Sequence, residues 1–181
     1  MQDGNVNIWI FNLVMEGLLQ TTDDGTGIEP ALAESYDVSD DGLTYTFHMK
    51  DGLVFSNGDP VLGEDLVWSY EYAMTSADSV WSDLLSGIKS VEAPDDKTFI
   101  AHMTEASPVS EPTFTLFNAT IGDKSYFDEV GPEGYAKKPI GTGAYKFDEW
   151  RQGEFLRVVK NDLYRDAASV KTQAIKFTVV P

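Results

Sequence analysis

The chain has 181 residues, 42% of them hydrophobic and 12% aromatic, which is enough for the packed core of one domain or of one domain with a small appendage. Its net charge of −17 argues against a nucleic-acid-binding protein, because recognition of a phosphate backbone needs clustered lysine and arginine. The absence of cysteine excludes disulfides, thiolate metal sites and cysteine nucleophiles. The sequence has no apolar run long enough to cross a bilayer and no charged-then-apolar leader, so we expect that any export signal has been removed or never existed.

The first third of the chain predicts a helix followed by strands. Asn5 to Leu19 is rich in apolar residues at roughly helical spacing, with Asn5 or Asn7 placed to cap its start. Residues 31–34 fit either a short helical turn or a bridge into a strand. From Ser35 the pattern changes to period two, which predicts a strand whose apolar face consists of Leu43, Tyr45, Phe47 and Met49.

The middle of the chain predicts two helices and a hairpin. Glu64 to Met74 has one apolar stripe and two acidic residues in its first turn, where the helix dipole favours negative charge. A shorter helix is expected over Ser79 to Leu85. Two strand-like runs, Ile88 to Ala93 and Lys97 to Met103, predict a hairpin across the turn at residues 94–96.

The last third predicts short helices followed by strands. The helices are expected over Glu111 to Phe117 and Lys124 to Val130. The strands are expected over Ala144 to Glu149, Phe155 to Lys160 and Ala174 to Val180. Because the sequence stops at the end of a strand, we expect this chain to be a fragment.

Gly141-Thr142-Gly143 is the most distinctive short motif. A dinucleotide fingerprint needs a third glycine and a following helix, and a P-loop needs a terminal Gly-Lys-Ser or Gly-Lys-Thr. Here a strand-like run follows at once, so the pair of glycines does not predict a phosphate site. It predicts a tight turn that lets two segments approach closely.

Residues that could carry catalysis are few. His48 and His102 occupy alternating positions of predicted strands, which is typical of a solvent-facing or hydrogen-bonded histidine. The adjacent carboxylate pairs all lie at turns or at a helix start, where aspartate and glutamate have structural roles. We therefore predict no enzyme activity, no catalytic residue, no metal and no cofactor. An acidic hydrolase, which would need two carboxylates from distant segments, and a structural surface module stay as alternatives from other classes.

Several motifs, read in order, are similar to one protein family. They are Met15-Glu16-Gly17-Leu18-Leu19, Pro30-Ala31-Leu32-Ala33-Glu34-Ser35-Tyr36, Ser39-Asp40-Asp41-Gly42-Leu43-Thr44-Tyr45-Thr46-Phe47-His48, Asp51-Gly52-Leu53-Val54-Phe55-Ser56-Asn57-Gly58-Asp59-Pro60-Val61, Glu64-Asp65-Leu66-Val67-Trp68-Ser69-Tyr70, Val91-Glu92-Ala93-Pro94-Asp95-Asp96-Lys97-Thr98, Pro139-Ile140-Gly141-Thr142-Gly143-Ala144-Tyr145-Lys146-Phe147 and Asn161-Asp162-Leu163-Tyr164. Together they resemble the oligopeptide/dipeptide/nickel class of ABC-transporter extracellular solute-binding proteins (family 5), over essentially the whole chain. Leu62-Gly63 replaces the usual Thr-Ala before Glu64-Asp65. The change removes a threonine N-cap and is expected to cost about 1 kcal/mol of helix stability. The other departures from the family pattern are Met15, Ala144, Asp162 and Arg165. None of them affects a residue with a chemical role.

The resemblance implies a fold and a domain organisation. The expected class is α/β (mixed α+β): one lobe of a class II periplasmic-binding-protein-like fold, with a mixed sheet and an inserted α+β subdomain. Residues 1–34 would begin the first lobe, 35–140 would form the inserted subdomain and 141–181 would supply the return strands. Family members are two to three times longer, so the second lobe is expected to be absent.

The resemblance also implies a function. It predicts a receptor that binds oligopeptides or dipeptides and delivers them to a membrane permease. The receptor would be a monomer outside the cytoplasm, either periplasmic or a cell-surface lipoprotein, and it would attach to the membrane only through an anchor that is not present in this chain. A nickel chelate or an oligosaccharide is the alternative ligand within the family.

Candidate ligand-binding residues follow from the same resemblance. Trp81 lies in a stretch where family members place an aromatic side chain against the ligand. Core packing is the default interpretation of a tryptophan, but the small polar residues around Trp81 suit a cleft wall. Asn5, Asn7 and Ile8 lie in a second stretch that resembles a cleft wall. Asn118 and Thr120 lie where a nickel-chelate binder has an arginine, and the absence of arginine there favours peptides.

Overall fold

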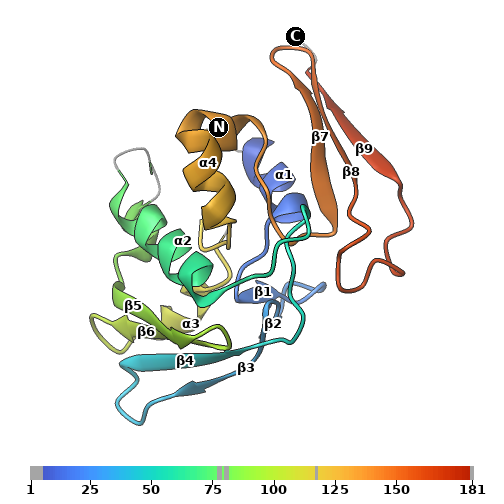
Figure 1. Cartoon of the computed structure of the whole chain (residues 1–181). Coiled ribbons are helices and arrows are strands. Elements are labelled where there is room, and N and C mark those ends of the chain that lie inside the picture. Colours follow the sequence, from blue (N-terminus) through green and yellow to red (C-terminus); the bar gives the residue numbers. More distant parts are fainter. Residues whose placement is uncertain (1–5, 77–78, 80–81, 117, 180–181) are drawn as a thin grey trace. The chain divides into compact units, whose positions relative to one another are not determined.

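The computed structural model describes residues 6–76, 79, 82–116 and 118–179. The chain forms two compact units, which we describe separately. Unit 1 contains residues 1–15, 54–60 and 122–181, and unit 2 contains residues 16–53 and 61–121. Figure 1 shows the elements, which are α1 (Val6–Val14), β1 (Leu19–Thr21), β2 (Ile28–Pro30), β3 (Ala33–Val38), β4 (Thr44–Met49), α2 (Gly63–Thr75), η1 (Ser82–Leu85), β5 (Ile88–Asp95), β6 (Thr98–Met103), α3 (Ser110–Thr113), α4 (Lys124–Lys137), β7 (Tyr145–Arg151), β8 (Phe155–Lys160) and β9 (Ala174–Thr178).

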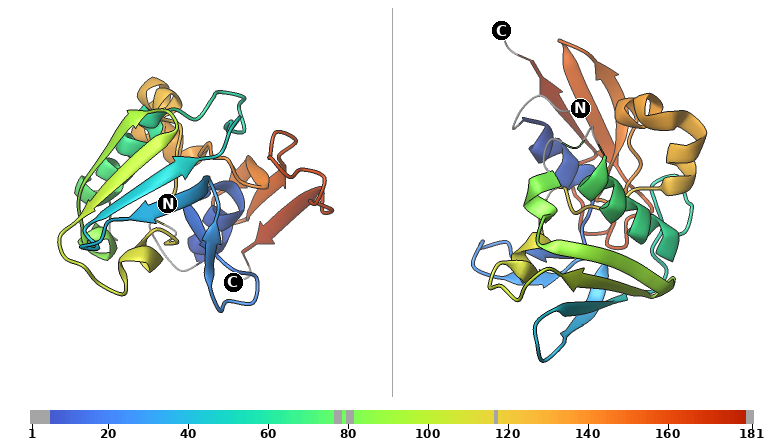
Figure 2. Two further views of the ribbon diagram at one scale, coloured as in Figure 1. Left: turned by 90° about the horizontal axis from the view of Figure 1, so that it is seen from below. Right: turned by 90° about the vertical axis from the view of Figure 1, so that its left-hand side faces the viewer.

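Unit 2 is built on an antiparallel sheet with the strand order β3-β4-β6-β5, and α2 packs along β5 and β6 (Figures 1 and 2). The alternation predicted for β4 is confirmed at Tyr45, Phe47 and Met49, which are buried while the residues between them are more exposed. It is wrong at Leu43, which precedes the strand and is 36% exposed. The rings of Phe47 and Phe99 contact each other and Tyr70 packs on Phe99, with centroids 6.2 and 4.9 Å apart. An aromatic core therefore lies between the sheet and its covering elements.

The opposite face of this sheet is polar, and both histidines lie on it. His48 Nε2 is 2.9 Å from a carboxylate oxygen of Asp37, and His102 Nε2 is 3.1 Å from one of Glu92. The two rings are partly exposed, and each is paired with a residue of a neighbouring strand. The prediction of hydrogen-bonded strand histidines is thus confirmed.

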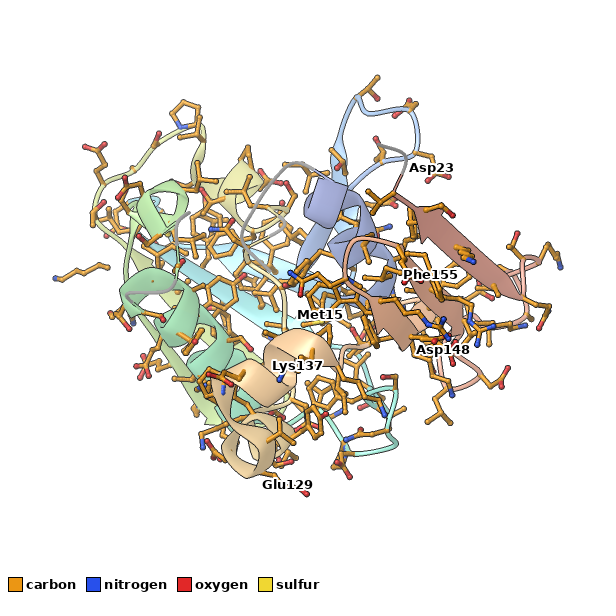
Figure 3. All side chains as sticks on the ribbon, turned by 90° about the horizontal axis from the view of Figure 1, so that it is seen from above. Met15, Asp23, Glu129, Lys137, Asp148 and Phe155 are labelled. Carbon is orange, nitrogen blue, oxygen red and sulfur yellow. The ribbon has the colours of Figure 1, made fainter. Side chains whose placement is uncertain are left out.

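Unit 1 packs α1 against an antiparallel sheet with the order β7-β8-β9. Its core contains apolar side chains from the helix and from the inner face of the sheet, namely Ile10, Val14, Met15, Tyr145, Leu156 and Val158. The outer face carries the charged groups, including an ion pair between Arg157 and Asp148. Figure 3 labels Met15 together with Asp148 and Phe155, which lie on β7 and β8.

Several predicted boundaries need correction. The helix predicted to Leu19 ends at Val14, because residues 17 and 19–21 enter β pairings instead. Of the two alternatives for residues 31–34, the structure shows the bridge into a strand, because residues 33 and 34 begin β3. The predicted hairpin turn is shifted, since Pro94 and Asp95 still belong to β5.

The two later helices also differ in length from those expected. The helix predicted over residues 111–117 is the single turn α3. In contrast, α4 continues to Lys137 across a kink, where Gly131 has φ 70° just ahead of Pro132. Glycine tolerates this left-handed backbone, so a second helical segment can follow the break.

Candidate functional site

The predicted ligand-binding residues fall into three groups. Trp81 and Asn5 lie outside the described residues. Asn7 and Ile8 belong to helix α1, whose described part begins at Val6, so Asn7 lies inside the helix and is not its cap. Asn118 and Thr120 belong to unit 2 and lie in the segment between α3 and the end of that unit.

The described residues 114–116 and 118–121 of unit 2, which we call the 114–121 segment, are held by backbone pairing of residues 114, 120 and 121 with residues 16–19. Thr120 forms an isolated antiparallel bridge with Gly17, and Ile121 N–H donates a 2.9 Å hydrogen bond to the carbonyl of Glu16. Ala119 and Ile121 are buried, whereas Asn118 and Thr120 are half-buried. The pairing therefore holds two polar side chains at the boundary between the core of unit 2 and solvent.

This pairing leaves little room for a side chain at Gly17. A Cβ atom at position 17 would lie 3.1 Å from the carbonyl oxygens of both Phe114 and Ala119. Such contacts with backbone are closer than a side chain normally makes, so the segment would have to shift. The Glu-Gly-Leu motif of the sequence thus has a structural role, because its glycine allows the 114–121 segment to pack closely against residues 16–19.

The start of the segment is anchored through α3. The hydroxyl of Tyr36 donates a short hydrogen bond to the Glu111 carboxylate in the first turn of α3. Burial, followed by the hydrogen bond and charge of Glu111, raises the pKa of Tyr36 to about 12, so the hydroxyl stays a donor at neutral pH. Burial also raises the pKa of Tyr45, the next ring in the same stack.

The chemistry offered by the 114–121 segment is neutral. An amide and a hydroxyl can donate and accept hydrogen bonds, which suits an uncharged polar group such as a peptide backbone. Within the described ranges, no group of three or more His, Asp or Glu residues is placed to hold a metal ion. The sequence of unit 2 contains no arginine.

A second constellation lies in unit 1, around Gly141-Thr142-Gly143, and it is structural. The backbone carbonyls of residues 140, 141, 143 and 144 each accept a hydrogen bond from a different donor. The donors are Tyr135 Oη to Ile140 (2.9 Å), Ser56 N–H to Gly141 (2.9 Å), Asn161 Nδ2 to Gly143 (2.9 Å) and Asn161 N–H to Ala144 (3.0 Å). Three motifs that carry the family resemblance therefore meet at this turn.

The two glycines are needed because the turn lies against the end of α1. A Cβ atom would come within 2.3 Å of the Val14 carbonyl oxygen at position 141, and within 2.5 Å of the Leu13 carbonyl oxygen at position 143. Gly143 N–H also donates a 2.9 Å hydrogen bond to Val14. The prediction of a close-approach turn is confirmed, and the buried side chain of Asn161, which sequence reasoning did not single out, is part of it.

Comparisons with known proteins agree with this architecture. A family model described as "Bacterial extracellular solute-binding proteins, family 5 Middle" matches residues 27–181. The dipeptide-binding protein DppE of Bacillus subtilis strain 168 is 28% identical over 97% of this chain and 35% of its own length. OppA of Listeria monocytogenes, solved bound to peptide, is 27% identical with a TM-score of 0.90, covering 98% of this chain and 39% of that one.

NikZ of Campylobacter jejuni, solved in complex with Ni(L-His), is 26% identical with a TM-score of 0.83, covering 93% of this chain and 34% of that one. The chain thus spans about a third of the length of the relatives that it matches. The observed combination of helices and sheets confirms the predicted α/β (mixed α+β) class, but all strand pairs among the described residues are antiparallel, so the expected mixed sheet is not observed there. Among the described residues, no helix is both long enough and apolar enough to span a membrane. From the match of the family model and the agreement in fold, the chain belongs to the bacterial extracellular solute-binding proteins of family 5.

Proposed function

We propose that this chain is part of a receptor that binds oligopeptides or dipeptides outside the cytoplasm and delivers them to an ABC-transporter permease. The observation that carries this proposal is the likeness of nearly the whole chain, 98%, to a solute-binding protein solved with peptide bound. The neutral polar character of the 114–121 segment supports the same ligand class.

The binding mechanism follows from the physical chemistry of extended peptides. The ligand backbone presents N–H and C=O groups that need partners, and strand-like hydrogen bonds supply them. Asn118 and Thr120 supply such partners from this chain, and Trp81 supplies an aromatic surface. Asn5, Asn7 and Ile8 contribute a second lining segment. Water in roomy side-chain pockets keeps the sequence preference weak.

Domain closure completes the site. Two lobes close on the ligand by a hinge motion, which buries the ligand and forms the surface that docks on the permease. Residues 1–34 and 141–181 belong to the first lobe, and residues 35–140 form its inserted subdomain. Because the second lobe supplies many of the polar contacts, this chain alone binds peptide weakly.

The remaining assignments follow from the same role. The receptor acts as a monomer without enzyme activity, and a lipid anchor or periplasmic confinement keeps it near the permease. A nickel chelate is the second candidate ligand, because a relative that binds Ni(L-His) shares the fold. The carboxylate of a metal-chelating ligand is better served by an arginine than by the Asn118 amide, which is the reason that peptides are favoured.

Ligand identification in the complete receptor tests the proposal. Native mass spectrometry of the receptor purified without added ligand should release short peptides, and adding them back should raise its melting temperature. As a matched control, Ni(L-His) at the same concentration should leave the melting temperature unchanged. A receptor stabilised by the chelate or by an oligosaccharide, and by no peptide, would contradict the proposal.

A further inference from the structure

The two units differ sharply in charge. Unit 2 contains 19 of the 30 acidic residues and three of the 13 basic residues, which gives it a formal charge of −16 at neutral pH. Unit 1 contains 11 acidic and 10 basic residues, which gives it a formal charge of −1. The excess negative charge of the chain is therefore concentrated in one folding module.

The ion pairs described in unit 2 include two that depend on histidine. Lys97 pairs with Asp51 at 2.8 Å, whereas the pairs of His48 with Asp37 and of His102 with Glu92 carry opposite charges only when the histidine is protonated. In unit 1 the described pairs join permanently charged groups, as in Lys124 with Asp128 and Arg151 with Glu149. The described pairs of unit 1 therefore keep both charges across the neutral pH range.

Several carboxylates of unit 2 are also fixed in the ionised state. Two threonines donate hydrogen bonds to Asp24 and lower its pKa to about 2. Ser39 and the backbone of Leu43 lower the pKa of Asp41 in the same way. These local hydrogen bonds favour the charged form of two carboxylates, so their negative charge persists at neutral pH.

The distance over which salt screens charges is comparable to the size of unit 2. The Debye length is about 30 Å at 0.01 M salt, about 10 Å at 0.1 M and about 3 Å at 1 M. A six-residue strand such as β4 is about 20 Å long. At low salt, charges across the whole of unit 2 repel one another, whereas at high salt only near neighbours do. Self-repulsion of this kind destabilises a compact state relative to the extended chain.

We propose that unit 2 is a salt-dependent folding module: ionic strength sets its local stability through screening of its own carboxylates, while unit 1 is nearly indifferent to salt. This inference does not depend on the identity of the ligand. It makes the folded population of the module that contains the 114–121 segment respond to the ionic strength of the surroundings.

Hydrogen exchange of the whole chain can separate the two units. Protection of the β4 and β6 amides, measured at pH 7 and referred to intrinsic rates at the same salt, should rise about tenfold between 0.01 and 0.5 M KCl. Protection of the β8 amides should change less than about twofold over the same range. Because unit 1 is an internal control, a general salting-out effect would stabilise both units equally and would contradict the proposal.

Matched charge variants test whether repulsion among the carboxylates of unit 2 causes its salt response. Asp40→Asn, Glu34→Gln, Glu71→Gln and Glu105→Gln remove four exposed charges from unit 2, and together they should reduce its salt response at least about twofold. The control is Glu129→Gln, Glu133→Gln, Asp162→Asn and Asp166→Asn, which remove four exposed charges from unit 1 and should leave the response of β4 and β6 intact.

Comparing two salts tests independently, and without any variant, whether screening or specific cation binding causes the response. CaCl2 at an ionic strength matched to KCl should give a similar response if screening is the cause. Saturation of the response at micromolar CaCl2 would indicate a specific cation site and would overturn the proposal. An unchanged salt response in a folded unit 2 charge variant would overturn it as well.

Discussion

Asn57 and Asp123, which are 66 residues apart in sequence, are joined by a 2.8 Å hydrogen bond from the side-chain amide of Asn57 to Oδ2 of Asp123. The other oxygen of Asp123 accepts hydrogen bonds from Tyr126 N–H and Ser125 Oγ, so this carboxylate caps helix α4. Asp123 is 1% exposed. One buried carboxylate therefore ties the 54–60 loop of unit 1 to the start of a helix.

Replacing Asp123 should destabilise unit 1. Asp123→Ala removes the N-cap of α4 and leaves Asn57 without this partner, so we expect a loss of about 2 kcal/mol in the free energy of unfolding. Urea denaturation followed by unit 1 amide signals measures it. The control is Asp128→Ala, which breaks a surface pair with Lys124 and should cost less than about 0.5 kcal/mol. Equal losses in the two variants would contradict the capping role.

The glycine turn should tolerate no side chain. Gly143→Ala would force a Cβ atom to 2.5 Å from the Leu13 carbonyl oxygen, so we expect a loss of at least about 3 kcal/mol or failure of unit 1 to fold. Gly87→Ala is the matched control, because the nearest atom to its Cβ is the end of the Met103 side chain at 3.8 Å. A Gly143→Ala protein as stable as the control would show that the turn is not a close-approach joint.

Two tyrosines should respond oppositely to the same change. The Tyr70 hydroxyl is fully buried, has no hydrogen-bond partner among the described residues, and burial raises its pKa. Tyr70→Phe should therefore leave the free energy of unfolding unchanged or raise it by up to about 1 kcal/mol. Tyr36→Phe removes the hydrogen bond to Glu111 and should lower the free energy of unfolding by about 1 kcal/mol. Thermal denaturation of both variants measures the difference, and a larger loss for Tyr70→Phe would contradict this account.

The hairpin loop between β1 and β2 should show a strongly acidic carboxyl. Hydrogen bonds from Thr22 and Thr26 lower the pKa of Asp24 from 3.8 to about 2. A pKa that is lower in the folded state stabilises the fold above the unfolded pKa, and this contribution is lost as the pH falls from about 4 through about 2. NMR titration of the Asp24 carboxyl carbon should give this midpoint.

The cause of the low Asp24 pKa can be isolated at one position. Thr22→Val removes a 2.7 Å hydrogen bond and should move the pKa of Asp24 upward, toward 3.8. Thr22→Ser keeps the hydroxyl and should leave the midpoint near its original value. If both variants gave the same midpoint, the Thr22 hydroxyl would not be the cause.

Sequence periodicity was most reliable where one face of an element is buried. The alternation of β4 and the apolar stripe of α2 follow directly from the requirement that one face meets the core. The end of α1 could not be predicted in the same way. Residues 17–19 are still apolar, and only their pairing with distant residues such as Thr120 draws them into β structure.

The candidate site was less accessible to sequence reasoning than the fold. The glycines at 17, 141 and 143 were visible as motifs, but their partners at positions 114, 119 and 14 are known only from the structure. The role of Asn161 at the turn likewise depends on a contact 18 residues away. Ligand contacts at Asn118 and Thr120 stay predictions, because a binding residue has no periodic signal of its own.

A titration of the isotope-labelled chain with a short neutral peptide tests the central claim most directly. We expect peptide to shift the amide resonances of Asn118 and Thr120 in fast exchange, without saturation at millimolar concentration, because one lobe supplies only part of the site. Resonances of the 22–27 loop should stay unchanged as an internal control. If peptide left positions 118 and 120 unperturbed while Ni(L-His) or an oligosaccharide shifted them, the assignment of this chain to a peptide receptor would be wrong.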